Sequence, residues 1–140
     1  MINKGMMSSN SNEWATPIKF FEELNKEFKF TLDPCATKDN AKCEKYFTKE
    51  DDGLTKDWSG ERVFCNPPYG REIPYWVKKC YEENKINNTL IVMLIPARTD
   101  TSYFHDYIYN KQEIRFIRGR LKFNDGKNPA PFPSMVVIFK

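Results

Sequence analysis

The sequence predicts an α/β domain built on a mostly parallel sheet, and three observations support this fold class. Apolar segments of strand character alternate along the chain with segments whose apolar residues recur at helical spacing. Residues 89–95 are apolar at nearly every position, which is typical of a strand buried on both faces. Polar or conformationally special residues follow three predicted strands, at positions 33, 66–69 and 96–98. Because ligands bind beyond the carboxyl ends of such strands, we expect a binding site there.

The first half of the chain is predicted to contain one amphipathic helix followed by three strands. The helix covers residues 18–28, with Pro17 at its start and Thr16 as its N-cap. A short strand ends at Asp33, a weak strand lies near residues 45–48, and residues 62–65 form the third strand. The apolar residues that recur at helical spacing are Ile18, Phe21, Leu24 and Phe28.

The second half is predicted to add two helices and three strands. A helix in residues 73–85 carries Pro74 in its first turn, and the apolar strand of residues 89–95 follows. The next helix covers residues 99–110, with Thr99 or Thr101 as its cap. The chain then forms a strand that leads into a basic turn, in residues 113–123, and a final antiparallel strand, in residues 134–140.

Length and composition indicate one domain. A chain of 140 residues can bury one core of its own. Residues 1–12 are polar and rich in Ser and Asn, so we expect a disordered tail of residues 1–12 and a single domain of residues 13–140. No apolar run reaches membrane-spanning length and no signal peptide is visible, so we expect a cytoplasmic protein. The net charge of +3 permits a nucleic-acid partner without requiring one.

The four cysteines predict free thiols rather than a metal site. None of them lies in a C-x-x-C pair, and His105 is the only histidine. Zinc sites draw their ligands from clusters of such residues. We therefore expect no bound metal, a structural role for His105, and thiols that stay reduced in the cytosol.

The segment "CNPPYG", residues 65–70, is the most distinctive in the chain. The amide oxygen of Asn66 and the carbonyl oxygen of Pro67 can accept both hydrogens of a planar amine conjugated to a ring, which favours a pyramidal, more nucleophilic nitrogen. Pro68 restricts Pro67 to an extended backbone, so the two acceptors are preorganised. Tyr69 can stack on the ring that carries the amine.

The same four residues also admit a purely structural interpretation. Consecutive prolines are common in turns, and Asn is a frequent turn residue. Asn66 would then only end the strand, and Tyr69 would be a core residue.

Asn-Pro-Pro-Tyr after an apolar strand resembles the catalytic motif of S-adenosylmethionine-dependent amino methyltransferases. A longer set of segments, in this order, resembles the phage-type DNA N-6-adenine methyltransferases. The similarity extends from about residue 14 to residue 139, and it implies a compact Rossmann-like methyltransferase fold with S-adenosylmethionine as cofactor and DNA as partner. The segments are "WATP", "LDPCAT", "NAKCEKYFT", "DDGLTKDW", "CNPPYG", "MLIPARTDTSYFHDYI", "IRFIRGRLKF" and "APFPSMVVIF".

The resemblance also implies roles for individual residues. Asn66 and Pro67 would hold the target amine, Pro68 would fix their geometry, and Tyr69 would stack on a base flipped out of the DNA. In typical members of the class a glycine-containing turn follows the position of Asp33, and "DPCATKDN" lacks those glycines. The implied cofactor-binding residues are Trp14, Thr16, Pro17, Asp33, Cys35, Asp51 and Asp52, with Glu50 and Asp57 as further candidates.

Simpler roles remain open for several of these positions. Asp33 can be a turn cap before Pro34, and Thr16 a helix cap beside a Trp14 that packs in the core. The acidic loop of residues 50–57 can be a solvated surface loop.

Basic residues near the expected site predict contacts with DNA phosphates. Arg98 follows the central strand, near the expected mouth of the site. Arg118 and Arg120 flank a glycine on a turn and alternate to one side of the chain, and Lys122 and Arg115 lie nearby. An exposed basic edge strand that resists aggregation is the alternative.

Together these observations lead us to expect a site-specific, adenine-specific DNA methyltransferase. Without a separate recognition domain it should read a short sequence or be weakly selective. We expect a stand-alone phage modification enzyme that works in the host cytoplasm and protects a viral genome from restriction. A protein-glutamine or RNA methyltransferase with the same motif is one alternative, and a DNA-binding module with a decayed cofactor site is another.

Overall fold

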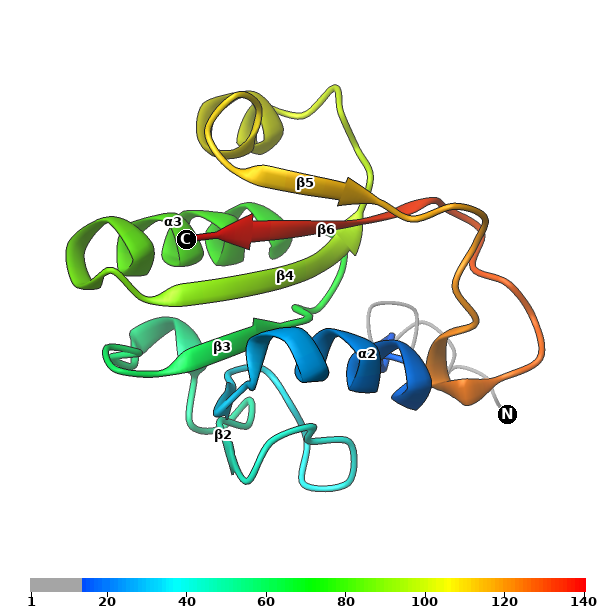
Figure 1. Ribbon diagram of the computed structural model, residues 1–140, viewed down its shortest axis with the longest axis horizontal. Coiled ribbons are helices and arrows are strands. Elements are labelled where there is room, and N and C mark those ends of the chain that lie inside the picture. Colours follow the sequence, from blue (N-terminus) through cyan, green and yellow to red (C-terminus); the bar gives the residue numbers. More distant parts are fainter. Residues whose placement is uncertain (1–13) are drawn as a thin grey trace.

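A computed structural model describes residues 14–140, and the expected tail of residues 1–12 lies outside the described residues. In this part of the chain six strands form one sheet in the order β2-β1-β3-β4-β6-β5 (Figure 1). The first four strands pair in parallel, and β6 is antiparallel to β4 and β5, so the predicted fold class is confirmed. The strands are β1 (Leu32–Asp33), β2 (Lys45–Tyr46), β3 (Arg62–Cys65), β4 (Leu90–Pro96), β5 (Glu113–Phe116) and β6 (Ser134–Phe139).

The centre of the core is the antiparallel pair β4 and β6. Both strands are continuous apolar runs, and β6 is buried at all six positions and β4 at six of seven. Side chains on both faces of these strands are covered, which is why neither sequence alternates between apolar and polar residues.

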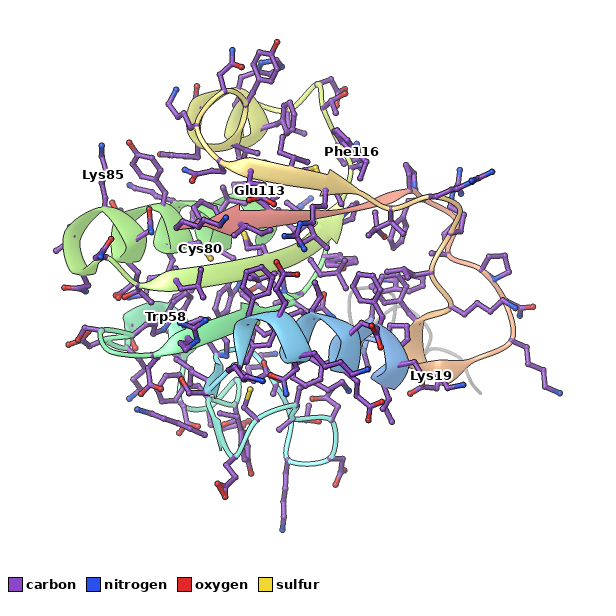
Figure 2. All side chains as sticks on the ribbon, in the orientation of Figure 1. Lys19, Trp58, Cys80, Lys85, Glu113 and Phe116 are labelled. Carbon is purple, nitrogen blue, oxygen red and sulfur yellow. The ribbon has the colours of Figure 1, made fainter. Side chains whose placement is uncertain are left out.

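Two helices cover the two faces of the sheet. Figure 1 shows α2 (Ile18–Phe28) in front of β3 and α3 (Ile73–Asn87) behind β4 and β6. The helix α2 buries Phe21, Leu24 and Phe28 as its spacing predicts, whereas Ile18, the first residue of the helix, is 52% exposed. Trp58 (Figure 2) is fully buried under α3 and stacks on Trp76.

Thr16 is not the N-cap of α2, contrary to the sequence prediction. Pro17 occupies that position and makes no side-chain cap. The backbone N–H of Ile18 instead donates to Asp125 Oδ1 (3.1 Å), in the short helical turn η3 (Phe123–Asp125). The first turn of α2 is therefore capped by a residue far away in the sequence, and the Thr16 hydroxyl is left for another partner.

The helix predicted in residues 99–110 is much shorter in the structure. Residues 102–108 are helical, with the π-helical turn η2 (Phe104–Ile108) as their main part, and Asn110 ends the segment at φ 60°. The Thr101 hydroxyl accepts a hydrogen bond from the Phe104 N–H (3.3 Å), so Thr101 rather than Thr99 caps it.

The strand predicted in residues 113–123 ends early, at Phe116. Its only partner in the sheet, β6, begins at Ser134, and the last paired residues are Phe116 and Met135. Phe116 (Figure 2) lies at the edge of the sheet and is 62% exposed. Residues 117–133 therefore form a long connection at the carboxyl end of the parallel strands, here called the β5–β6 loop (Figure 1).

Gly53 allows the acidic loop to pack tightly against the residue that follows β1. It begins the short helical turn η1 (Gly53–Thr55), and its carbonyl accepts a hydrogen bond from Trp58 Nε1 (3.0 Å). A Cβ atom at this position would lie 2.1 Å from the Pro34 carbonyl oxygen. That distance is too short for any side chain, so only glycine lets the two loops meet.

We expect Gly53→Ala to destabilise the protein by about 1–3 kcal/mol, because the added methyl group must push two backbone segments apart. Denaturant unfolding followed by circular dichroism measures the change. Gly126→Ala is the matched control, since its Cβ would lie 3.3 Å from the nearest atom and its φ of −84° suits any residue. Equal stability of the two variants would contradict the tight contact.

Candidate active site

The carboxyl ends of β1 and β3 open into a cavity of about 360 Å³, here called the first cavity. This is the edge of the sheet at which the strand order predicts a ligand site, and the volume suits a small ligand or cofactor. The structure brings together eight of the predicted site residues in its lining. They are Trp14, Thr16, Asp33, Cys35, Asp52, Asn66, Pro67 and Pro68.

The Asn66 side chain is held in one orientation by its amide nitrogen. Nδ2 donates to the Trp14 carbonyl oxygen (2.5 Å) and to Thr16 Oγ1 (3.0 Å), which uses both of its hydrogens. A carbonyl oxygen can only accept, so the nitrogen rather than the oxygen must face Trp14. Oδ1 is buried and has no hydrogen-bond partner within residues 14–140. A buried acceptor without a partner is costly, and it indicates a place where a ligand donates.

Asp33 is a buried carboxyl group on the wall of the first cavity. It is 5% exposed, and its Oδ2 accepts a hydrogen bond from the Lys42 N–H (3.0 Å). Burial raises the pKa of Asp33 to about 6, and the backbone N–H groups of Lys42 and Cys35 offset part of that rise. A positively charged ligand in the first cavity would stabilise the ionised form of Asp33, which burial disfavours.

The acidic loop separates into residues that line the first cavity and residues that do not. Asp52 lines it and has φ 59°. The Asp51 carboxylate instead accepts hydrogen bonds from the backbone N–H (2.9 Å) and hydroxyl (3.1 Å) of Thr48, which lower its pKa. Asp57 similarly accepts from the Ser59 N–H (2.8 Å), and neither Glu50 nor Asp57 is part of the lining.

Cys35 and Cys65 place two thiols beside the motif. Their sulfur atoms are 3.7 Å apart, and the Cys35 thiol donates to the Asn66 carbonyl oxygen (3.3 Å). Burial raises the pKa of both thiols well above the usual value, so they stay protonated. All four cysteines are free.

Tyr69 is nearly buried and borders a second cavity, of about 540 Å³. Its hydroxyl donates to the Leu94 carbonyl oxygen (3.1 Å), and burial raises its pKa, so the phenol stays neutral. Its ring meets Phe132 and Phe123 edge-on, at centroid distances of 5.6 and 6.0 Å. The role predicted for Tyr69, stacking on a base, requires a ligand in this second cavity.

The second cavity has aromatic walls and a positively charged rim. Arg71 and Arg98 line it, and no carboxylate of residues 14–140 does. Both arginines are exposed, and neither guanidinium group has a hydrogen bond or ion pair within the described part of the chain. The aromatic lining residues are Trp14, Tyr69, Tyr103 and Phe132. Trp14 lines both cavities and therefore separates them.

A family model described as DNA N-6-adenine-methyltransferase (Dam) matches residues 4–140. The chain belongs to this family. The resemblance noted in the sequence is thereby confirmed.

Three known proteins are similar in sequence to this chain. A DNA N-6-adenine-methyltransferase of Haemophilus phage HP1 (strain HP1c1) is 30% identical over 148 residues, which cover all of this chain and 85% of that protein. The enzyme of the same name from Escherichia phage T1 is 36% identical over 110 residues, 77% of this chain but 45% of its own length. A putative methyltransferase, YfdM, of Escherichia coli (strain K12) is 44% identical over 66 residues, 41% of this chain and 71% of its own.

The basic residues predicted to bind DNA lie in two places in this family member. Arg98 lines the second cavity, whereas Arg118, Arg120 and Lys122 are exposed on the β5–β6 loop and line neither cavity. Arg120 donates to the Ala130 carbonyl oxygen (3.3 Å) within the loop. Arg115 is paired with Glu27 and Glu113, so its charge is already compensated.

Sequence reasoning missed two residues that shape the site. Arg71 lies two positions after the motif and lines the second cavity. Its position as a basic residue between the motif and the start of α3 could have identified it from the sequence. Asn124 exchanges two hydrogen bonds with the backbone of Ala15 (2.8 and 3.0 Å), and no local signal points to a partner so distant. Pro17, predicted to bind the cofactor, lies next to the first cavity in sequence but is not part of its lining.

Two further findings concern the described residues only. No helix in residues 14–140 combines the length and apolar character needed to cross a membrane. No group of three or more His, Cys, Asp or Glu side chains in this range is arranged to hold a metal ion.

The raised pKa of Asp33 predicts a specific dependence of stability on pH. Because the folded state binds this proton more tightly than the unfolded state, Asp33 contributes stability below about pH 4 that is lost as pH rises through about 6. We expect Asp33→Asn, which cannot ionise, to gain up to about 3 kcal/mol relative to wild type between these limits. Denaturant unfolding of both proteins from pH 4 to 7 measures this difference, and a difference that stays constant with pH would contradict it.

Proposed function

We propose that this protein transfers a methyl group from S-adenosylmethionine to the N6 amine of adenine in DNA. The observation that carries the proposal is the buried, unpartnered Oδ1 of Asn66 at the wall of the first cavity. Its two neighbours in the lining, Pro67 and Pro68, belong to the motif that acts on conjugated amines, and the chain belongs to a family described by this reaction.

The first cavity suits S-adenosylmethionine on chemical grounds. That cofactor carries a cationic sulfonium and an ammonium group, and the buried Asp33 carboxyl offers a matching negative charge. Asp52 on the same wall can accept hydrogen bonds from hydroxyl or amino groups. When bound, the cofactor supplies an electrophilic methyl group next to Asn66.

The chain's own residues would then orient the amine rather than deprotonate it. Asn66 Oδ1 and the Pro67 carbonyl oxygen accept its two N–H groups and favour the lone pair on nitrogen. With the cofactor bound, the nitrogen would take the methyl group as the methyl–sulfur bond breaks, and it would then release one proton to water. No strong base is required, since the amine becomes acidic only after it gains the methyl group.

Asn66→Ala should lower the methylation rate by on the order of a hundredfold or more, because one of two preorganised acceptors is lost. The measurement is transfer of a labelled methyl group to DNA, followed by digestion and identification of the modified base. Cofactor affinity, measured by calorimetry, should change little. Near-normal turnover in this variant would remove the proposed mechanism.

The target base must leave the DNA stack to reach Asn66, because its amine is paired inside a duplex. The second cavity, next to Tyr69, offers aromatic walls for such a base and two unpaired guanidinium groups for the flanking phosphates. The β5–β6 loop adds Arg118, Arg120 and Lys122 at the same edge of the sheet.

We expect Arg71→Ala/Arg98→Ala and Arg118→Ala/Arg120→Ala each to weaken DNA binding. Each lost phosphate contact should reduce the slope of log affinity against log salt concentration by roughly one. Fluorescence anisotropy at several salt concentrations measures both double variants.

The control for these variants is Lys26→Ala/Lys85→Ala, which removes the same charge near the ends of α2 and α3. Lys85 lies at the opposite edge of the sheet from the motif (Figure 2). If a double arginine variant keeps the slope of the control, that pair lies outside the DNA-binding surface.

A further inference from the structure

The segment that precedes α2, residues 14–16, crosses the carboxyl end of β3 and holds the Asn66 side chain. We propose that Thr16 is a positioning residue for Asn66, and that the Trp14 carbonyl beside it makes the site require an amide, not a carboxylate, at position 66. This inference rests on the proposed function, because it concerns the orientation of the acceptor for the target amine.

The burial and contacts of Thr16 support this role. Thr16 is 3% exposed, although it lies at the start of a surface helix. It does not cap that helix, and its hydroxyl oxygen instead accepts a hydrogen bond from Asn66 Nδ2 (3.0 Å). Its side chain is therefore committed to a residue 50 positions away, on the wall of the first cavity.

Segment 14–16 is itself fixed from its other side. The Ala15 N–H donates to Asn124 Oδ1 (3.0 Å), and the Asn124 N–H donates to the Ala15 carbonyl oxygen (2.8 Å). The Trp14 ring packs edge-on against Phe123 and Phe132 (5.7 and 5.1 Å). The β5–β6 loop thus holds the backbone whose carbonyl faces Asn66.

A fixed amide matters because the two ends of an asparagine side chain are chemically opposite. Rotation of the amide by half a turn places N–H donors where Oδ1 was, and donors repel an amine whose hydrogens need acceptors. The terminal torsion of asparagine has a broad, roughly two-fold preference, so its own stereochemistry does not select one end. The Trp14 carbonyl oxygen, which can only accept, makes that selection, and the Thr16 hydroxyl holds the second hydrogen of the amide.

The same contacts discriminate against aspartate. A carboxylate at position 66 would place an oxygen against the Trp14 carbonyl oxygen, and two acceptors without a hydrogen between them repel. A protonated carboxyl group could donate to Trp14 and still present its other oxygen to the amine. An aspartate at this position should therefore support the reaction only when it carries a proton.

The first experiment compares Thr16→Val with Thr16→Ser in single-turnover methylation of DNA. Valine keeps the shape of threonine but removes the hydroxyl, whereas serine keeps the hydroxyl. We expect Thr16→Val to reduce the rate at saturating DNA and cofactor roughly tenfold to a hundredfold through misplacement of the acceptor. Thr16→Ser should restore most of the rate, and a normal rate in Thr16→Val would overturn the proposal.

A double-mutant cycle separates positioning from a general structural role. If Thr16 acts through Asn66, then Thr16→Val should have no further effect on the rate in the Asn66→Ala background. Equal fold-losses in both backgrounds would overturn the proposal. Failure of wild type to methylate DNA would instead refute the proposed function itself.

The last experiment uses Asn66→Asp and does not depend on the folding of a Thr16 variant. We expect its activity, relative to wild type, to rise as pH falls from about 8 towards 5.5, as the carboxyl group gains a proton. Methylation by Asn66→Asp at the wild-type level at pH 8 would overturn the proposed requirement for an amide. A relative activity that is low and independent of pH would also overturn it.

Discussion

The hydrogen bonds between Asn66 and segment 14–16 are the constraint on which the rest of the site depends. They join the end of β3 to the start of α2, and the exchange between Ala15 and Asn124 extends the connection to the β5–β6 loop. Three parts of the chain that are far apart in sequence thereby meet at one side chain. Trp14, which lines both cavities, belongs to this segment.

The site contains polar groups that the fold alone does not satisfy. Asn66 Oδ1 is buried without a partner in residues 14–140, and Asp33 is a buried carboxyl group with a raised pKa. Both cost stability in the free protein, since neither a lone acceptor nor a buried charge is well solvated there. The surrounding core, above all the fully covered β4 and β6, offsets that cost and keeps these groups in place.

Much of the fold could be predicted from sequence because its signals are local. The apolar runs of β4 and β6, the spacing of Phe21, Leu24 and Phe28, and the prolines after β3 each indicate their own element. The rule that parallel strands end at one edge then correctly brought Asp33 and Asn66 to one cavity.

What could not be predicted depends on distant partners or on backbone conformation. The local sequence around Thr16 is typical of a helix cap. Its hydroxyl has a different partner because the fold places Asn66, 50 positions away, next to it. Asp51 and Asp52 are adjacent and chemically identical, yet the positive φ of Asp52 puts one on the cavity wall while Thr48 holds the other. The pairing that ends β5 at Phe116 is likewise decided by where β6 begins.

The position of Trp14 between the two cavities gives the protein an intrinsic optical reporter. Indole emission shifts with the polarity of its surroundings, and ligands on either side of Trp14 change those surroundings. Trp58 is fully buried and lines neither cavity, although it stacks on Trp76, which lines the first cavity alone. Spectra of single-tryptophan proteins would therefore distinguish, without any added dye, which of the two cavities is filled first.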